Sequence, residues 1–448
     1  MKKLFGTDGI RGHAGKFPLD ASTVKTIGLS LSRQYKAQLG RPSRFVTGRD
    51  TRESGDWIER AFHAGALEGG AHCRSSGVIT TPGVAFVTRH FEFDAGVVIS
   101  ASHNPYEDNG LKIFAPDGKK VGEDIESVIE SDIRSLVTGA DVGDGSAVDD
   151  SQARNFQAAY ADHLAGAFKG SRLERFKLVV DCANGAAYEL APPLFRRLGA
   201  DVIVFNDRPD GRNINKDCGS LHLEHLQSRV LTENADLGVA FDGDADRALF
   251  VDEKGNIVDG DATLWIMAEF LRSKGGLAND TVVATVMSNI GLEIALTSAG
   301  LQLVRTPVGD KYVLDELIRT GSDLGGEQSG HVIFPRESLV GDGIMTTLLM
   351  LEAIHLNAKP VSNLLEGFTR YPQVLVNVHV SEKQPFESVS AISAAARQIE
   401  SQLDGSGRLL LRYSGTENLA RVMIEGKDQA EIERQANSLA EVIKASLG

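Results

Sequence analysis

Residues 177–204 read KLVVDCANGAAYELAPPLFRRLGADVIV, and this stretch decides the fold. An apolar run of strand length leads into a polar turn containing Gly185, then into a helix-like stretch through Leu198. A second apolar run follows Gly199. Strand, helix and strand in this order form the βαβ pattern, and strands that are apolar throughout indicate a parallel sheet covered on both faces.

The same pattern occurs again in residues 44–71 and 281–304. Its spacing of roughly 100 residues exceeds the 20–50 residues of solenoid repeats, so we predict three related α/β domains with mixed, mostly parallel sheets. Residues 373–448 contain alternating strands and a final amphipathic helix, which predict an α+β domain with an antiparallel sheet. We expect domains at 1–150, 151–252, 253–368 and 369–448.

The composition narrows the functional classes. The chain has 448 residues, with 47 Lys and Arg against 61 Asp and Glu, so its net charge is −14. Nucleic acid and anionic membranes are poor partners for such a chain, because both bind clustered positive charge. Three dispersed cysteines and the lack of a long apolar segment favour a reducing compartment and predict a cytoplasmic protein.

Three carboxylates, Asp242, Asp244 and Asp246, alternate after the apolar stretch 237–240. They can converge if the chain turns, which Gly243 permits. Clustered carboxylates repel one another unless a cation is present, and hard oxygen ligands select Mg²⁺ or Ca²⁺ over zinc. A solvated acidic turn is the plain alternative.

Calcium is the second cation to consider. With Asp242 at the first position of an EF-hand loop, Glu253 would occupy the twelfth. The sixth position, however, holds Arg247 instead of the glycine that the loop requires, and a strand, not a helix, is expected before it. The sequence therefore favours magnesium.

A second polar turn follows the apolar stretch 97–99 and contains Ser102 and His103. Ligands bind at such strand ends in α/β folds, so Ser102 could be a nucleophile or a phosphate carrier. From the residues alone a turn-forming role is favoured, because no G-x-S-x-G elbow is present. Lys112, in a later strand-like stretch, could be a general base, although an exposed strand residue is the simpler interpretation.

Two further turns could bind ligands. Residues 411–418 place Arg412, two hydroxyl side chains and a glycine in a strand-to-strand turn, which suits a phosphate as well as it suits a plain polar hairpin. Residues 325–331 read GGEQSGH and could offer hydrogen bonds to a polyhydroxyl ligand, or form an ordinary turn.

Together and in this order, the motifs resemble the α-D-phosphohexomutase superfamily along the whole chain. The resemblance rests on residues 5–12 (FGTDGIRG), 100–105 (SASHNP), 242–247 (DGDADR), 326–331 (GEQSGH) and 412–417 (RYSGTE). The first octet, DGDAD in place of DGDGD, and Glu-Gln-Ser favour the glucosamine branch. Asn418 departs from the proline usual at this position, which could loosen the turn but removes no phosphate ligand.

The resemblance implies that the three α/β domains and the α+β domain are arranged around a central active-site cleft, and it implies a role for each site residue. Ser102 is the phosphoserine, and Asp242, Asp244 and Asp246 bind one Mg²⁺ together with its phosphate. The other implied residues are His103, Lys112, Arg11, Arg247 and His331 for phosphate and proton transfer, Glu327 and Ser329 for the sugar, and Arg412, Ser414, Gly415 and Thr416 for the non-reacting phosphate.

The implied reaction interconverts glucosamine 6-phosphate and glucosamine 1-phosphate, a step toward UDP-N-acetylglucosamine and the cell wall. A hexose 1,6-bisphosphate, glucose- or glucosamine-based, is the expected intermediate or activator, and a hexosamine phosphate is the expected small-molecule partner. A homodimer is one assembly compatible with the sequence. The alternatives are a phosphoglucomutase or phosphomannomutase of the same superfamily, a phosphatase, and a non-catalytic calcium-binding module.

Overall fold

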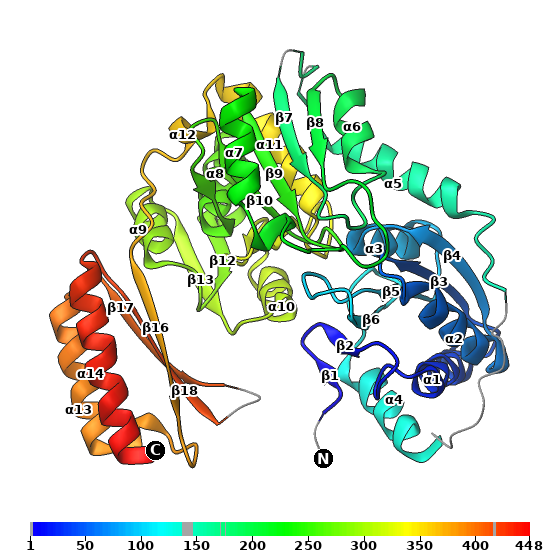
Figure 1. Cartoon of the computed structure of the whole chain (residues 1–448), viewed down its shortest axis with the longest axis horizontal. Helices are drawn as coiled ribbons and strands as arrows, with labels where there is room; N and C mark the ends of the chain where they lie inside the picture. Colours follow the sequence, from blue (N-terminus) through cyan, green and yellow to red (C-terminus); the bar gives the residue numbers. More distant parts are fainter. Residues whose placement is uncertain (1–2, 137–146, 171, 175, 415–417) are drawn as a thin grey trace. The chain divides into compact units, whose positions relative to one another are not determined.

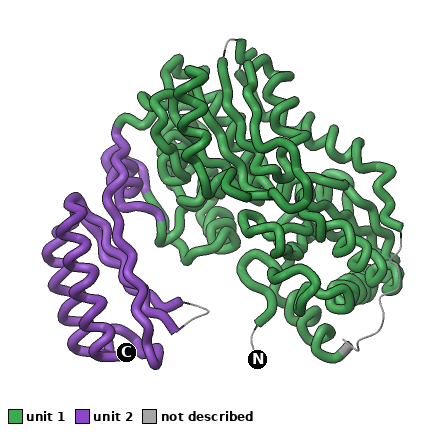
Figure 2. Tube along the Cα trace, viewed as in Figure 1, with its two compact units in different colours: residues 1–287, 303–366 green, residues 288–302, 367–448 purple. Residues whose placement is uncertain are grey.

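The computed structural model describes residues 3–136, 147–170, 172–174, 176–414 and 418–448. They divide into two compact units (Figure 2). Unit 1 comprises residues 1–287 and 303–366, and unit 2 comprises residues 288–302 and 367–448. The sheets are mixed, as predicted, and Figure 1 labels their strands and helices.

The first sheet has the order β1-β2-β6-β5-β3-β4. β5, β3 and β4 run parallel, while β6, β2 and β1 add antiparallel pairs at the other edge. The elements of this domain are β1 (Phe5–Gly6), β2 (Gly9–His13), α1 (Ala21–Leu39), β3 (Arg44–Arg49), α2 (Gly55–Glu68), β4 (His72–Val78), α3 (Thr81–His90), β5 (Ala95–Ile99), β6 (Asp108–Phe114) and α4 (Glu123–Leu136).

Alternation along β5 shows how this sheet is covered on both faces. All five residues of β5 are buried. Val97 and Ile99 belong to the core that the sheet forms with α1, α2 and α4. Because successive strand residues point to opposite faces, Gly96 and Val98 face the other side, where a Cβ added at Gly96 would meet Thr88 of α3. Layers on both faces explain why the strand is apolar throughout.

The second sheet has the order β11-β10-β9-β7-β8, with β9, β7 and β8 parallel and β10 and β11 antiparallel. α5 (Ala153–Ala167) precedes it. Its elements are β7 (Lys177–Asp181), α6 (Ala191–Arg197), β8 (Asp201–Phe205), α7 (Glu224–Glu233), β9 (Leu237–Phe241), β10 (Ala248–Asp252) and β11 (Ile257–Val258), with a short 3₁₀ turn at Gly219–Leu221.

The third sheet has the order β13-β12-β14-β15. Two of its strands are only two residues long, so they leave no alternating pattern in the sequence. The elements are α8 (Gly260–Ser273), β12 (Thr281–Thr285), α9 (Ile290–Ser298), β13 (Gln302–Thr306), α10 (Asp310–Thr320), β14 (Gly325–Gly326), β15 (Val332–Ile333), α11 (Gly343–Asn357) and α12 (Val361–Leu364), with a 3₁₀ turn at Ala278–Asp280.

The C-terminal sheet is antiparallel, as predicted, in the order β16-β18-β17, and α13 and α14 pack against it (Figure 1). Its elements are β16 (Gln373–His379), α13 (Ser390–Leu403), β17 (Arg408–Tyr413), β18 (Leu419–Glu425) and α14 (Gln429–Leu447), with a 3₁₀ turn at Phe386–Ser388.

Helix α9 belongs to unit 2, and one buried carboxylate explains why. Glu425 of β18 accepts a hydrogen bond from the backbone N–H of Ile290 at 3.2 Å and another from the side chain of Asn289 at 3.3 Å. Glu425 also forms an ion pair with Arg408 of β17 at 2.8 Å. The N-terminus of α9 is therefore held by the C-terminal sheet within unit 2. None of the described helices is long and apolar enough to cross a membrane.

Candidate active site

Ser102 lies in the turn that follows β5, at the end of the sheet where a ligand site was expected. Its side chain is fully buried. The Ser102 hydroxyl donates to Asp242 Oδ2 at 2.5 Å, and its Oγ lies 3.2 Å from His103 Nδ1. The structure thus joins two motifs that are 140 residues apart in sequence.

The three aspartates converge in the turn between β9 and β10. Asp242, Asp244 and Asp246 are all buried, and each offers an oxygen within 4.8 Å of those offered by the other two. Among the described residues, Asp244 Oδ1 and Asp246 Oδ1 have no hydrogen-bond donor. Buried carboxylate oxygens without donors are costly, and a hard cation such as Mg²⁺ would satisfy them. The donor set therefore fits the predicted metal.

The calcium alternative requires a helix before and after the loop. β9 and β10 flank it instead and pair with each other as antiparallel strands. The turn is a strand-to-strand connection, and the EF-hand interpretation does not describe it.

Lys112 is buried among these carboxylates. The simpler interpretation of the sequence, an exposed strand residue, is wrong, because Lys112 on β6 is only 1% exposed. Its Nζ lies 2.8 Å from Asp244, 3.2 Å from Asp246 and 3.1 Å from Asp8. Burial lowers the pKa of Lys112, but the three carboxylates outweigh burial and hold its pKa well above the usual value.

The charges around the triad push its pKa values apart. Burial, followed by Asp246 and Asp244, raises the pKa of Asp242 well above its usual value. Burial also acts to raise the pKa of Asp246, but Lys112 and His331 outweigh it, and the pKa lies well below the usual value. Such separation of neighbouring carboxyl groups is typical of functional sites.

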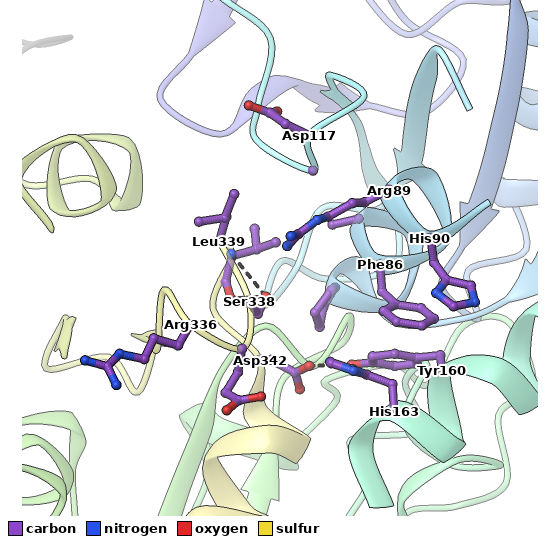
Figure 3. A pocket seen from close by; sticks show the side chains of 15 residues that line it. Phe86, Arg89, His90, Asp117, Tyr160, His163, Arg336, Ser338, Leu339 and Asp342 are labelled. Atoms are coloured by element: carbon purple, nitrogen blue, oxygen red, sulfur yellow. Dashed lines mark hydrogen bonds between the residues drawn. The ribbon is translucent and has the colours of Figure 1, made fainter. Parts of the chain in front are cut away.

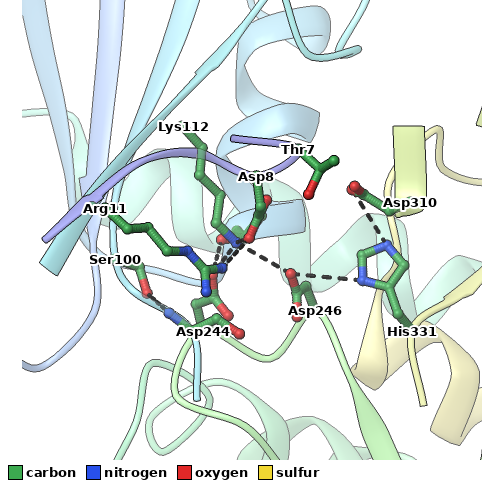
Figure 4. Close-up of polar contacts among 12 residues, drawn as sticks. Thr7, Asp8, Arg11, Ser100, Lys112, Asp244, Asp246, Asp310 and His331 are labelled. Atoms are coloured by element: carbon green, nitrogen blue, oxygen red, sulfur yellow. Dashed lines mark hydrogen bonds and ion pairs between the residues drawn. The ribbon is translucent and has the colours of Figure 1, made fainter. Parts of the chain in front are cut away.

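Lys112 and His331 both contact Asp246 (Figure 4), and a longer chain of ion pairs connects them through Asp8, Lys120 and Asp310. Asp8 contacts both Lys112 and Lys120, the latter at 2.6 Å. Lys120 in turn lies 2.6 Å from Asp310, which lies 3.8 Å from His331 Nε2. Sequence reasoning assigned no role to Asp8, Lys120 or Asp310, because only the fold brings residues from three separate segments together.

The remaining predicted residues of unit 1 lie around the same centre. Arg11 pairs with Asp8, and Arg247 Nε lies 3.7 Å from Asp246 Oδ1. His331 Nδ1 lies 3.7 Å from Asp246. Burial, with Arg247 and Arg11, lowers the pKa of His103 to about 4. Ser102, the aspartates and all five predicted transfer residues are thus brought together.

The predicted sugar loop connects β14 to β15. Glu327 Oε1 accepts the backbone N–H of Gly309 at 3.1 Å, and the Glu327 N–H donates to the carbonyl of His331 at 2.9 Å. The Ser329 hydroxyl is buried and has no hydrogen-bond partner among the described residues. Glu327 is therefore held in place by backbone contacts.

In unit 2, Arg412 stands opposite Arg421 in the antiparallel pair β17–β18. Burial, followed by Arg421, lowers the pKa of Arg412. Lys383 Nζ donates to the carbonyl of Ser414 at 2.6 Å. Two guanidinium groups at one register position and a nearby ammonium group favour an anion. Sequence reasoning missed Arg421 and Lys383, and the predicted Gly415 and Thr416 lie outside the described residues.

A cavity of about 380 Å³ lies outside this site, between α3, α5 and residues 336–342 (Figure 3). Its wall contains Asp342, which caps α11 by accepting the N–H groups of Ile344 and Met345. The Tyr160 hydroxyl also donates to Asp342, at 2.6 Å. Burial raises the pKa of Asp342 to about 6.

A buried serine hydroxyl on a carboxylate triad, beside a lysine and two arginines, is typical of enzymes that transfer a phosphoryl group with a divalent cation. Comparison with known families agrees. Four profiles of phosphoglucomutase/phosphomannomutase match: α/β/α domain I at residues 2–138, domain II at 158–255, domain III at 259–371 and the C-terminal domain at 375–442. The chain belongs to the phosphoglucomutase/phosphomannomutase family.

Curated relatives and solved structures extend along the whole chain. A protein of Solibacter usitatus named phosphoglucosamine mutase is 48% identical, covering 100% of this chain and 99% of its own length. A protein of the same name from Symbiobacterium thermophilum is 46% identical, and the match covers 100% of both chains. A crystal structure of a phosphoglucomutase/phosphomannomutase family protein from Burkholderia thailandensis has a TM-score of 0.79 at 25% identity, covering 99% of this chain and 97% of its own.

Proposed function

We propose that this chain interconverts glucosamine 6-phosphate and glucosamine 1-phosphate through a phosphoserine at Ser102. The observation that carries the proposal is the 2.5 Å contact of the Ser102 hydroxyl with Asp242 inside a buried carboxylate triad. The full-length relatives named phosphoglucosamine mutase support the choice of sugar.

The reaction balances as two phosphoryl transfers. Phosphorylated Ser102 gives its phosphoryl group to the C1 hydroxyl of glucosamine 6-phosphate; the C1 hydroxyl proton leaves to a base, and the released Ser102 oxygen takes up a proton. The resulting 1,6-bisphosphate reorients and returns the phosphoryl group on its C6 oxygen to Ser102, whose hydroxyl gives up its proton. The C6 oxygen takes up a proton, and glucosamine 1-phosphate is released.

Asp242, Asp244 and Asp246, with the Ser102 phosphate, would hold Mg²⁺, one per site. When bound, the cation supplies neutralisation of charge on the transferring phosphoryl group. A structure of the Aspergillus fumigatus N-acetylphosphoglucosamine mutase contains GlcNAc-6P and magnesium; at 21% identity and a TM-score of 0.68 it shows the fold. The metal proposal rests on the acidic triad with its unsatisfied oxygens.

The chain's own groups position the reactants and balance their charge. Lys112, Arg11 and Arg247 supply positive charge beside Ser102. Such fixed charges stabilise a developing phosphoryl transition state without reorganisation. Lys112, His331 and His103 are the groups that we propose for proton transfer.

The substrate's two ends require different contacts. Glu327 and Ser329 would accept and donate hydrogen bonds to sugar hydroxyls. Arg412, Ser414, Gly415 and Thr416 would bind the phosphate that is not reacting. The pairing of Arg412 with Arg421 supports an anion site in unit 2.

The test is Ser102→Ala in the full chain, with Ser32→Ala as the matched control. Ser32 is also fully buried, and its Oγ has no hydrogen-bond partner among the described residues. Conversion of glucosamine 6-phosphate, glucose 6-phosphate and mannose 6-phosphate is followed by ³¹P NMR. Mass spectrometry of the intact protein and its peptides locates phosphate.

We expect Ser102→Ala to lower turnover by about 10³-fold or more, as loss of a covalent nucleophile does, and Ser32→Ala to keep it. Peptides of the wild type should carry phosphate at Ser102. Near-normal turnover of Ser102→Ala would reject the mechanism. Faster turnover of glucose or mannose phosphate would favour the phosphoglucomutase or phosphomannomutase alternative, and release of free phosphate without isomerisation would favour a phosphatase.

A further inference from the structure

Ser102 has a left-handed backbone conformation, with φ of +52°. L-residues other than glycine populate this region sparsely, so contacts around such a residue must hold it there. The side-chain contact with Asp242 holds only the hydroxyl. The main chain is held by different groups, which contact the carbonyl oxygens of Ser102 and Asn104.

Arg52 is the first of these groups. Its Nη2 donates to the carbonyl of Ser102 at 3.2 Å and to that of Asn104 at 2.5 Å. The side chain is fully buried, and its Nη1 pairs with Asp50. Because the charge is balanced and the guanidinium is planar, its donors have a fixed direction.

Asn215 is the second group. Its Nδ2 donates to the same two carbonyls, at 2.9 Å from Ser102 and 3.0 Å from Asn104. Asn215 belongs to the family's domain II, which also carries the aspartate triad, whereas Arg52 belongs to domain I together with Ser102. The turn that contains Ser102 therefore accepts hydrogen bonds from both domains, domain I with the serine and domain II with the aspartate triad.

We propose that Arg52 and Asn215 are positioning residues for phosphoryl transfer: together they hold the Ser102 main chain against the domain that carries the metal-binding turn. This inference rests on the proposed function. Among the described residues neither side chain hydrogen-bonds to the triad, and both act through the backbone of Ser102. They set where the phosphoserine stands relative to Asp242.

The role predicts a particular kinetic signature. Phosphoryl transfer depends on the relative position of the serine oxygen and the charges that face it, and misplacement by about 1 Å can cost 10²-fold. Binding of the sugar depends on other residues. Loosening the turn should therefore lower kcat and leave KM for glucosamine 6-phosphate nearly unchanged.

The experiment compares Asn215→Ala with Asn206→Ala in the full chain. Arg52 is avoided, because its removal leaves Asp50 buried without a counter-charge. Asn206 is a matched control: it lies in the same domain, is left-handed at φ +51° against +58° for Asn215, and its Nδ2 donates to Asp181. Both variants lose an amide at a left-handed position, but only one loses contact with Ser102.

Steady-state kinetics, single-turnover transfer from phosphorylated Ser102 and thermal unfolding are measured for both. We expect Asn215→Ala to lower kcat and the single-turnover rate by about 10- to 100-fold, with KM within about twofold, and Asn206→Ala to match the wild type. The two unfolding temperatures should fall equally.

Equal activity of the two variants, whether both are active or both are impaired, would overturn the proposal. So would a rise in KM for Asn215→Ala at unchanged kcat. The wild type in the same assay separates the two levels of inference. If it fails to interconvert the sugar phosphates, the proposed function is rejected; if it turns over normally and Asn215→Ala does as well, only the positioning role is rejected.

Discussion

Gly243→Ala perturbs the contact between the serine turn and the metal-binding turn by adding a single methyl group. A Cβ built at Gly243 would lie 2.5 Å from the carbonyl oxygen of Ser102, 2.9 Å from Ile214 and 3.0 Å from Asn215 Nδ2. The φ of Gly243 is not left-handed, so alanine is acceptable to the backbone itself. The substitution therefore tests distance and not backbone strain.

The size of the effect follows from these distances. Ordinary contacts begin near 3.4 Å, so the two turns must separate by about 0.9 Å. Metal–ligand distances tolerate only about 0.2 Å, and a misplacement of about 1 Å can cost 10²-fold in rate. We expect kcat to fall by about 100-fold, or about 2.7 kcal/mol in the activation free energy. Overpacking should lower stability by about 1–3 kcal/mol.

The assay measures mutase turnover at saturating glucosamine 6-phosphate over a titration of Mg²⁺, with thermal unfolding in parallel. Gly166→Ala is the control, because a Cβ there meets nothing within 4 Å and Gly166 lies within helix α5. It should keep full activity and gain about 0.5–1 kcal/mol in stability. The reasoning is refuted if Gly243→Ala stays within threefold of the wild type, or loses activity only in proportion to the fraction unfolded.

Two other predictions concern stability. Because the folded state raises the pKa of Asp342 from 3.8 to about 6, the contribution of Asp342 to stability should fall as the pH rises through that range. Asp342→Asn cannot ionise, so its free energy of unfolding in urea should gain on that of the wild type between pH 4 and 6, by about 3 kcal/mol at most; a difference independent of pH would contradict this. Glu425→Ala should destabilise unit 2 by about 3 kcal/mol, because it leaves Arg408 without its buried partner. Faster hydrogen exchange in α9 is the readout, exposed Glu433→Ala is the control, and unchanged exchange would contradict the assignment.

The parts of the fold that could be predicted are those with a recognisable residue pattern within one short segment of the sequence. Each residue of β5, β9 and β12 is buried, and the strands are apolar except for the threonines at the two ends of β12. The aspartate triad could also be predicted from the sequence, because three carboxylates and a glycine directly after a buried strand have few physical interpretations. In contrast, β14 and β15 have two residues each, too few for a sequence pattern, and they form because they pair with neighbouring strands.

The parts that could not be predicted depend on distant partners. In the sequence, Lys112 cannot be distinguished from an exposed strand lysine. It is buried because the carboxylates of Asp8 and Asp244, which are distant in sequence, pair with it. The same holds for α9, whose place in a βαβ pattern gives no indication that Glu425 binds its N-terminus. Local periodicity determines which elements form, whereas the charges that meet between them are determined by tertiary structure.

The electrostatics of the site also order the candidate proton-transfer groups, which the sequence left open. Catalytic acids and bases are recognised by environments that push their pKa values apart. Burial, followed by Arg247 and Arg11, lowers the pKa of His103 to about 4, which favours its neutral form. Burial also acts to lower the pKa values of Lys112 and His331, but neighbouring carboxylates outweigh it and raise both. The carboxylates therefore favour the charged form of Lys112, and burial favours the neutral form of His103. On this basis we predict that Lys112 acts through its charge, His103 as a proton acceptor and His331 as a proton donor.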